Sequence, residues 1–288
     1  MSVCNLLKNG ININQDWEID YCCEMTNDGY VRPVFNDYDT FFKYRQPLYE
    51  QSKTKWIRGC EGCKHSEEVK NTSLRTFQNK RQEKLQISDD DYHIHHATLN
   101  LDNTCNLACR MCGTGASTKW QSYLRNAPEQ QEWMSTYYNV PADVKQYQFE
   151  MLKKYVLTSH LDYIMLGGGE PTQIKMYMQM FNYLIENNMS QNIELHIHTN
   201  GTRNMDGDWG SAIEKFKEAQ LVYSIDGTES NYEYIRTDSN WELVKSNIIS
   251  TANRFQSNDN ITCRVTYCFQ ALNAHKFKSD QEYFEKEL

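Results

Sequence analysis

The pattern that most constrains the fold is an alternation of apolar, strand-like runs with helical stretches in the later two-thirds of the chain. The strand-like runs cover residues 95–101, 161–166, 193–198, 221–225 and 261–269. The helical stretches cover residues 144–157, 173–187, 209–219, 241–255 and 276–288. The last three strand intervals are about 30 residues or a little more, which is the size of a βαβ unit. Strands that alternate with helices favour a parallel sheet, so we expect an α/β fold with five βα units.

The first ninety or so residues have a different character. Short strand-like pieces at 11–13 and 17–19 and a helical stretch at 39–55 lie among irregular segments. A polar run at 78–91 is typical of a linker. We therefore predict a small irregular, cysteine-containing domain with its linker at 1–91 and a larger α/β domain at 92–288.

Charge and hydropathy exclude several classes of protein. The net charge is −8, with 30 Lys and Arg against 38 Asp and Glu, so a general nucleic-acid surface is not expected. No apolar run approaches the roughly 18 residues of a membrane span, and the N-terminus lacks the features of a secretory signal. We expect a cytoplasmic protein without a membrane partner. Thiols stay reduced there, so the ten cysteines favour metal binding over disulfides.

Three cysteines stand close together after the first strand-like run, at Cys105, Cys109 and Cys112. Thiolates are soft ligands that suit iron–sulfur clusters, zinc or copper(I). A saturated cubane cluster takes four cysteines. Three on one loop can therefore leave one iron open, which is what a catalytic metal site needs. A structural zinc site is the alternative, although no fourth Cys or His follows closely downstream.

Glycines or polar residues follow each of the next three strand-like runs. Three glycines at 167–169 allow a sharp turn and a close approach to a ligand. Ligands of parallel α/β folds bind at the carboxyl ends of strands. Each motif alone is also compatible with an ordinary turn, cap or surface ion pair. The polar candidates at these ends are Glu170, Asn200, Ser224, Asp226 and Arg236.

Together these motifs resemble the radical S-adenosylmethionine (SAM) superfamily over about residues 93–273. The resemblance rests on the cysteine triplet, Gly-Gly-Glu-Pro at 168–171, Thr-Asn-Gly at 199–201 and Ser-Ile-Asp-Gly at 224–227, in that order. It implies a partial (β/α) barrel of about five to six βα units. It also implies that Cys105, Cys109 and Cys112 ligate a [4Fe–4S] cluster whose open iron chelates SAM. The residues implied to contact SAM are Met111, Gly168, Gly169, Glu170, Asn200, Ser224, Asp226 and Arg236. Met111 departs from the aromatic residue often found before the third cysteine.

The N-terminal cysteines resemble the twitch and SPASM auxiliary-cluster modules of the same superfamily. The ligands that this implies for a second [4Fe–4S] cluster are Cys4, Cys22, Cys60 and Cys63. Cys23 is an alternative to Cys22, and a structural zinc knot is an alternative to the cluster. Two features depart from the family: the module precedes the barrel, and Trp17 stands where glycine is often found.

The resemblance implies reductive cleavage of SAM to methionine and a 5′-deoxyadenosyl radical, which removes a hydrogen atom from a substrate. A reductase such as flavodoxin or ferredoxin would supply the electron. Relatives with such modules often act on peptides, so the expected substrate is a peptide or protein side chain, and a small molecule is the alternative. A cluster-bearing binding or electron-transfer protein is the alternative from another class. Cys263 and Cys268 are expected to be core thiols.

Overall fold

The computed structural model describes residues 3–25, 34–127 and 140–288. Within these residues, seven strands follow the hydrogen-bonded order β2-β1-β3-β4-β5-β6-β7. The pairs β1–β3, β5–β6 and β6–β7 are parallel, and β1–β2 is antiparallel. The α/β fold with a largely parallel sheet is thus confirmed, and all five predicted strands are present. The strands are β1 (Gly10–Ile13), β2 (Ile19–Asp20), β3 (His96–Leu99), β4 (Tyr163–Leu166), β5 (Glu194–Thr199), β6 (Glu218–Ser224) and β7 (Ile261–Thr266).

Contacts divide the chain into two compact units. The first combines Met1–Leu99 with Val140–Ile164, and the second combines Asn100–Asn139 with Met165–Leu288. β3 belongs with the N-terminal residues because it pairs with β1 from Gly10–His96 to Ile13–Leu99. The predicted domains at 1–91 and 92–288 stay a prediction.

The first unit contains a helix where the sequence suggested a linker. Helix α4 covers the first half of the polar run at 78–91. Ser73 caps it, accepting from the backbone N–H of Thr76 while the Thr76 hydroxyl accepts from the Ser73 N–H. The buried face of α4 is polar, including Arg75, Gln78 and Gln82, so no apolar periodicity marks it. The helices of this unit are α1 (Leu6–Asn9), α2 (Tyr38–Ser52), α3 (Glu61–Lys70), α4 (Leu74–Lys84) and α6 (Ala142–Tyr155).

The polar face of α4 binds the N-terminal segment of the chain. Arg75 Nη1 donates to the Val3 carbonyl at 2.7 Å, and Asn79 Nδ2 donates to the same oxygen at 2.9 Å. The Asn5 N–H donates back to Asn79 Oδ1 at 2.9 Å. These bonds satisfy polar groups that would be costly to bury alone, and they hold the chain on both sides of Cys4.

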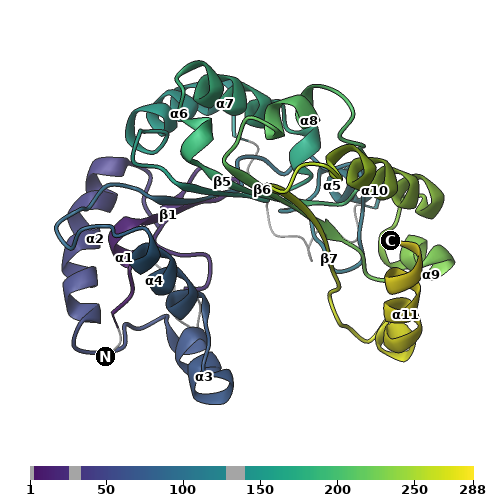
Figure 1. Cartoon of the computed structure of the whole chain (residues 1–288), viewed down its shortest axis with the longest axis horizontal. Coiled ribbons are helices and arrows are strands. Elements are labelled where there is room, and N and C mark those ends of the chain that lie inside the picture. The colour runs from purple at the N-terminus through teal and green to yellow at the C-terminus, as the bar shows by residue number, and fades with distance from the viewer. Residues whose placement is uncertain (1–2, 26–33, 128–139) are drawn as a thin grey trace. The chain divides into compact units, whose positions relative to one another are not determined.

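In the second unit, α7, α8 and α10 lie on one face of β5, β6 and β7 (Figure 1). The alternation of β5 explains this, because Leu195 and Ile197 are buried while His196 and His198 are more exposed on the opposite face. Phe181 of α7 packs against Trp209 of α8 with ring centroids 5.3 Å apart. The helices are α5 (Thr118–Arg125), α7 (Lys175–Glu186), α8 (Asp208–Ile213), α9 (Glu229–Ile235), α10 (Trp241–Phe255) and α11 (Phe277–Glu287).

Two expectations for this unit were wrong in detail. The helix expected at 209–219 ends at Ile213, and β6 already begins at Glu218. Cys263 is half-buried, because β7 is the last strand of the sheet and its side chains are largely exposed. Cys268 follows the end of β7 and is exposed. Helices α5 and α9 were not predicted; both are short, and α5 buries no residue.

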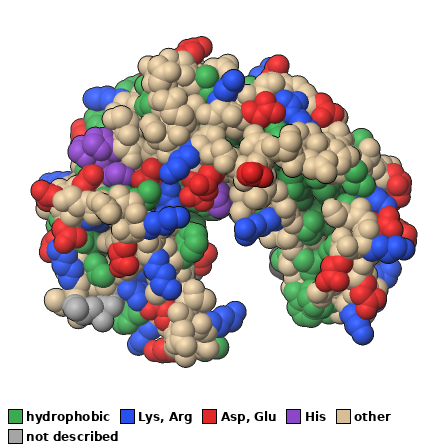
Figure 2. All heavy atoms as spheres, viewed as in Figure 1, with side chains coloured by type: hydrophobic (Ala, Val, Ile, Leu, Met, Phe, Trp, Pro, Cys, Tyr) green, Lys and Arg blue, Asp and Glu red, His purple; other side chains and the backbone are tan. Residues whose placement is uncertain are grey.

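Basic and acidic side chains are interspersed over the face shown in Figure 2, in keeping with the modest net charge of −8. None of the helices in the described part of the chain has the length and apolar character needed to cross a membrane.

Candidate active site

The loop that carries Cys105, Cys109 and Cys112 lies in the second unit and follows β3. Its backbone is tied to the end of α9, because Ala108 N–H donates to the Thr237 carbonyl at 3.0 Å and Arg110 N–H to the Ile235 carbonyl at 2.8 Å. The Ser117 hydroxyl at the start of α5 donates to the Leu107 carbonyl at 2.6 Å. The loop is therefore held from both sides without regular secondary structure of its own.

The glycine-rich loop after β4 packs directly on the cysteine loop. Gly169 N–H donates to the Asp102 carbonyl at 3.0 Å, and Glu170 N–H donates to the Thr104 carbonyl at 2.8 Å. A Cβ at Gly169 would lie 2.3 Å from the Thr104 oxygen. Gly168 has a φ of +94°, and a Cβ there would lie 2.6 Å from the Asp102 oxygen. Both glycines are thus required for the close approach of the two loops.

Glu170 is buried, with 1% of its surface exposed, and joins the glycine-rich loop to the end of β5. Its Oε1 accepts from the Thr172 N–H and hydroxyl at 3.1 and 2.7 Å and from the Thr199 hydroxyl at 2.8 Å. Its Oε2 accepts from the Asn200 N–H at 2.7 Å. Burial raises the pKa of this carboxyl, against the effect of those hydrogen bonds. Oε1 is used internally, and Oε2 can accept further bonds.

Asn200 and Arg236 each reach one of the cysteine sulfurs. Asn200 Nδ2 lies 4.0 Å from Cys105 Sγ, and Arg236 Nη1 lies 3.9 Å from Cys109 Sγ. Arg236 is held by Asp226, whose Oδ2 is 2.7 Å from Arg236 Nη2. Asp226 is fully buried, and its Oδ1 also accepts from the Cys268 N–H at 2.7 Å. Asp226 thus orients the guanidinium group of Arg236 through this ion pair.

The cysteine loop, the glycine-rich loop, the ends of β5 and β6, and Arg236 line a cavity of about 280 Å³ in the second unit. It includes every predicted SAM-contacting residue except Asp226. His198 also lines the cavity and was missed. It lies near the end of β5, two residues before Asn200, and this spacing of two is the signal that could have found it. The lining residues are Cys105, Leu107, Cys109, Met111, Cys112, Ala116, Ser117, Gly167, Gly168, Gly169, Glu170, His198, Thr199, Asn200, Ser224 and Arg236.

The three thiols differ in acidity. The hydrogen bond with Cys109 lowers the pKa of Cys112 to about 7, and it raises the pKa of Cys109, which burial raises further. Burial also raises the pKa of Cys105. The Arg236 charge lowers the pKa of both Cys109 and Cys112. Because metals bind the thiolate form, ligation here would release protons from the two more basic thiols.

A second group of cysteines meets in the first unit. Cys4, Cys22, Cys60 and Cys63 line a small cavity of about 20 Å³ together with Arg75, whereas Cys23 is not among its lining residues. Burial raises the pKa of Cys4 to about 11 and that of Cys60 to about 12. Cys4 precedes α1, Cys22 follows β2, Cys60 is the N-cap of α3 and Cys63 lies in its first turn. The fold thus gathers residues that are far apart in the sequence.

Trp17 has a backbone conformation of the kind that glycine adopts most readily. Its φ is +63°, in the left-handed region that costs an ordinary residue about 1–2 kcal/mol. The side chain is nevertheless buried, with 3% exposed. Burial of a large aromatic side chain stabilises the fold by more than this backbone conformation costs.

Comparisons with solved structures give distant likenesses. "Native anSMEcpe with bound AdoMet" is 18% identical with a TM-score of 0.47, covering 67% of this chain and 48% of that chain. The crystal structure of Streptococcus suis SuiB bound to S-adenosylmethionine is 14% identical with a TM-score of 0.42, covering 85% of this chain and 49% of that chain. This chain therefore spans about half the length of the proteins it resembles. No curated protein matches it.

The family model described as "Radical SAM superfamily" matches residues 99–271, which is more than half of the chain. The matched segment contains the cysteine loop, the glycine-rich loop and the carboxyl ends of β5 and β6, all of which meet at the cavity of the second unit. The α/β fold is consistent with a partial radical SAM barrel. The chain belongs to the Radical SAM superfamily.

Proposed function

We propose that this protein is a radical SAM enzyme that removes a hydrogen atom from a peptide or protein side chain. The observation that carries the proposal is the cavity of the second unit, where three thiols share one space with the glycine-rich loop and the polar ends of β5 and β6. Family membership supports an enzyme of this class. The peptide substrate rests on the resemblance of the N-terminal cysteines to auxiliary-cluster modules, whose bearers often act on peptides.

The residues present fit a [4Fe–4S] cluster with SAM beside it. Cys105, Cys109 and Cys112 offer three soft ligands on one loop. Gly168 and Gly169 leave the adjoining wall without side chains. When bound, the cluster and SAM supply a one-electron bond cleavage that yields a 5′-deoxyadenosyl radical able to take a hydrogen atom from the substrate. The protein supplies binding, orientation and electrostatics.

The chain's own residues have separate tasks at this site. Arg236, whose side chain is 11% exposed, places a positive charge beside Cys109, which stabilises thiolate ligands and influences the reduction potential of a cluster held there. Polar atoms for the amino acid and ribose parts of SAM come from the Glu170 carboxylate, through its Oε2, and from the side chains of Asn200 and Ser224. Met111 offers a thioether in place of an aromatic ring for packing.

The proposal is tested by anaerobic reconstitution with iron and sulfide, followed by assay for 5′-deoxyadenosine with SAM and a strong reductant. We expect one cluster's worth of iron at the three-cysteine loop and a reductant-dependent release of 5′-deoxyadenosine. A fully loaded protein that binds SAM but forms no 5′-deoxyadenosine would instead support a non-catalytic binding or electron-transfer protein. Addition of candidate peptides or small molecules then separates the two substrate classes by their effect on this rate.

We further propose that Cys4, Cys22, Cys60 and Cys63 hold a second, auxiliary [4Fe–4S] cluster. Their convergence on one small cavity supports this, and the placement of Cys22 there favours it over Cys23. A reductase such as flavodoxin or ferredoxin is the expected electron donor.

If the auxiliary cluster is present, replacing two of its ligands should remove its iron and leave the catalytic cluster in place. The double variant Cys60→Ser and Cys63→Ser is expected to lose about four irons per chain while retaining SAM cleavage in the absence of substrate. Cys23→Ser is the matched control, because Cys23 neighbours Cys22 but does not line the cavity, and it is expected to keep all its iron. Iron and sulfide analysis with Mössbauer spectra provides the measurement. Zinc in the wild-type protein in place of the second cluster would contradict the proposal.

A further inference from the structure

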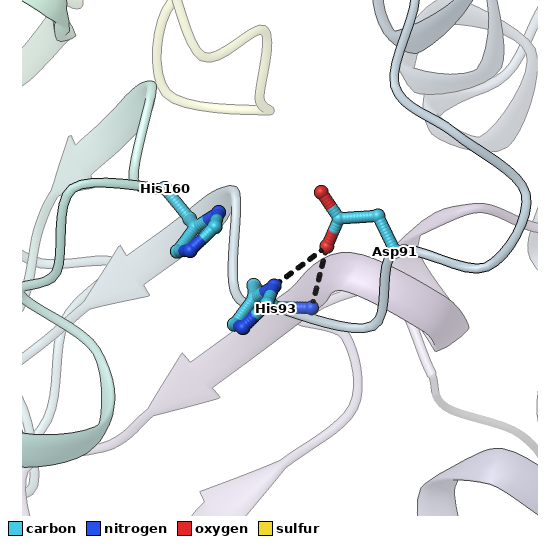
Figure 3. A group of neighbouring side chains, drawn as sticks. All are labelled: Asp91, His93 and His160. Carbon is cyan, nitrogen blue, oxygen red and sulfur yellow. Dashed lines mark hydrogen bonds and ion pairs between the residues drawn. The ribbon is translucent and has the colours of Figure 1, made fainter.

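A cluster of metal-ligating side chains lies in the first unit, apart from all the cysteines. Asp91 and His93 belong to the loop before β3, and His160 belongs to the loop before β4 (Figure 3). One ligand atom from each residue lies within 4.8 Å of those from the other two. In the described part of the chain, these three form the one set of His, Cys, Asp and Glu residues that meets this distance.

Asp91 is held in a fixed orientation by a buried histidine. Its Oδ2 lies 3.0 Å from His95 Nε2, and His95 Nδ1 lies 2.8 Å from Asp162 Oδ2. Arg81 in turn pairs with Asp162 and donates from Nη2 to the Asp162 carbonyl at 3.0 Å. Partners of this kind orient a metal-ligating carboxylate and increase its affinity. Asp91 Oδ1 is thereby presented toward His93.

His93 already pairs with that oxygen at a distance close to that of two ligands on one ion. His93 Nδ1 lies 2.9 Å from Asp91 Oδ1. Tetrahedral zinc bonds of about 2.0–2.2 Å to nitrogen and oxygen place two ligand atoms about 3.3–3.5 Å apart, so the ion can enter once this pair loses its shared proton and widens by about half an ångström. The side chain of His93 is 60% exposed, which gives the ion a path from solvent and room for a water ligand.

His160 can complete the site after one rotation. Its ring lies parallel to that of His93, with centroids 3.6 Å apart and planes 3° from parallel, as Figure 3 shows. A ligating lone pair lies in the plane of its ring, so one of the two rings must turn about its Cβ–Cγ bond to bind the same ion. His160 makes no hydrogen bond to the described residues that would have to break in that turn, and its ring contacts are with His93 and His95.

We propose that Asp91, His93 and His160 form a site for one divalent transition-metal ion of the zinc type. Two imidazoles and one carboxylate are ligands that suit zinc, nickel or copper(II) better than calcium or magnesium. The ion links the loop before β3 to the loop before β4 and so strengthens the first unit. The site is independent of the cysteines and of the proposed enzymatic function.

Zinc binding by the cluster-loaded protein tests the proposal. The protein is dialysed anaerobically against micromolar zinc chloride, and zinc and iron per chain are measured by mass spectrometry. Wild-type protein is expected to bind one zinc ion more than His160→Ala and Asp91→Asn. His65→Ala is the matched control, because His65 is an exposed histidine on α3 of the same unit, and it is expected to bind as much zinc as wild type.

Iron content and thermal unfolding without zinc show whether each variant is folded. Zinc bound by cysteines is common to all four proteins and cancels in the comparison. The proposal would be overturned if wild type, His160→Ala and Asp91→Asn bound the same amount of zinc per chain. It would also be overturned if His65→Ala lost as much zinc as those two variants. A zinc-dependent rise of the melting temperature that is absent from His160→Ala would further support it.

Discussion

Simultaneous replacement of Cys105, Cys109 and Cys112 by alanine is expected to lower the rate of SAM cleavage by more than about 100-fold, because loss of groups that merely support a metal ligand already costs 10–100-fold. The three thiols are proposed as the only protein ligands of the catalytic cluster, so about four irons per chain should be lost with them. Iron analysis and the 5′-deoxyadenosine assay measure the two effects. The N-terminal cysteines are untouched, and the remaining iron should match that of the auxiliary cluster.

The control for this variant is Cys268→Ser. Cys268 is exposed and lies outside the cavity, so its replacement should leave iron content and SAM cleavage unchanged. Far-UV circular dichroism shows whether the triple variant keeps its fold. We expect that it does, because backbone hydrogen bonds to Ile235 and Thr237 hold the cysteine loop without the thiols. A folded triple variant with full iron content and cleavage would refute the proposed active site.

Gly169→Ala is expected to weaken SAM binding by about tenfold or more and to destabilise the protein by about 1–3 kcal/mol, the usual cost of overpacking. The new Cβ would lie 2.3 Å from the Thr104 oxygen and 2.6 Å from the Asn103 carbonyl carbon. Both are backbone atoms and cannot rotate away, so the cysteine loop and the glycine-rich loop must separate. Their separation would displace Glu170 and the cysteines from each other.

Gly113→Ala is the matched control, because it lies directly after Cys112 and no atom beyond its chain neighbours lies within 4 Å of the position that a Cβ would take there. It should bind SAM and unfold as wild type does. Isothermal titration calorimetry with SAM and thermal unfolding of both variants provide the comparison. Wild-type affinity in Gly169→Ala would show that the contact between the two loops is unimportant for binding.

Several features of the site could be predicted because they depend on local spacing. The three cysteines lie within a stretch of eight residues from Cys105 to Cys112, so they stay on one short segment whatever the fold. Glu170, Asn200 and Ser224 lie at or just after the ends of strands, and carboxyl ends of parallel strands share one edge. Their meeting at the cavity therefore follows from the alternation of strands and helices alone.

Other roles could not be predicted, because they depend on which groups meet across long distances in the sequence. Asp226 follows a strand as the other predicted SAM contacts do. It does not line the cavity, however, and instead forms an ion pair with Arg236, which does. Glu170 was expected as a SAM contact, and its spacing gave no sign that most of its hydrogen-bonding capacity joins two segments of the protein. The linker expected at 78–91 begins as a helix, because its polar side is buried against the N-terminal segment.

The five strands from β3 to β7, the fold class and the family could be predicted from the sequence itself, because apolar runs and motif spacing are properties of short stretches of the chain. Only the tertiary structure shows that Cys22, and not Cys23, lines one cavity with Cys4, Cys60 and Cys63. It alone also shows that His160 stacks on His93 from a loop more than sixty residues away. Side chains brought together in this way are selected by packing and hydrogen bonding of the whole unit, and no local pattern encodes that selection.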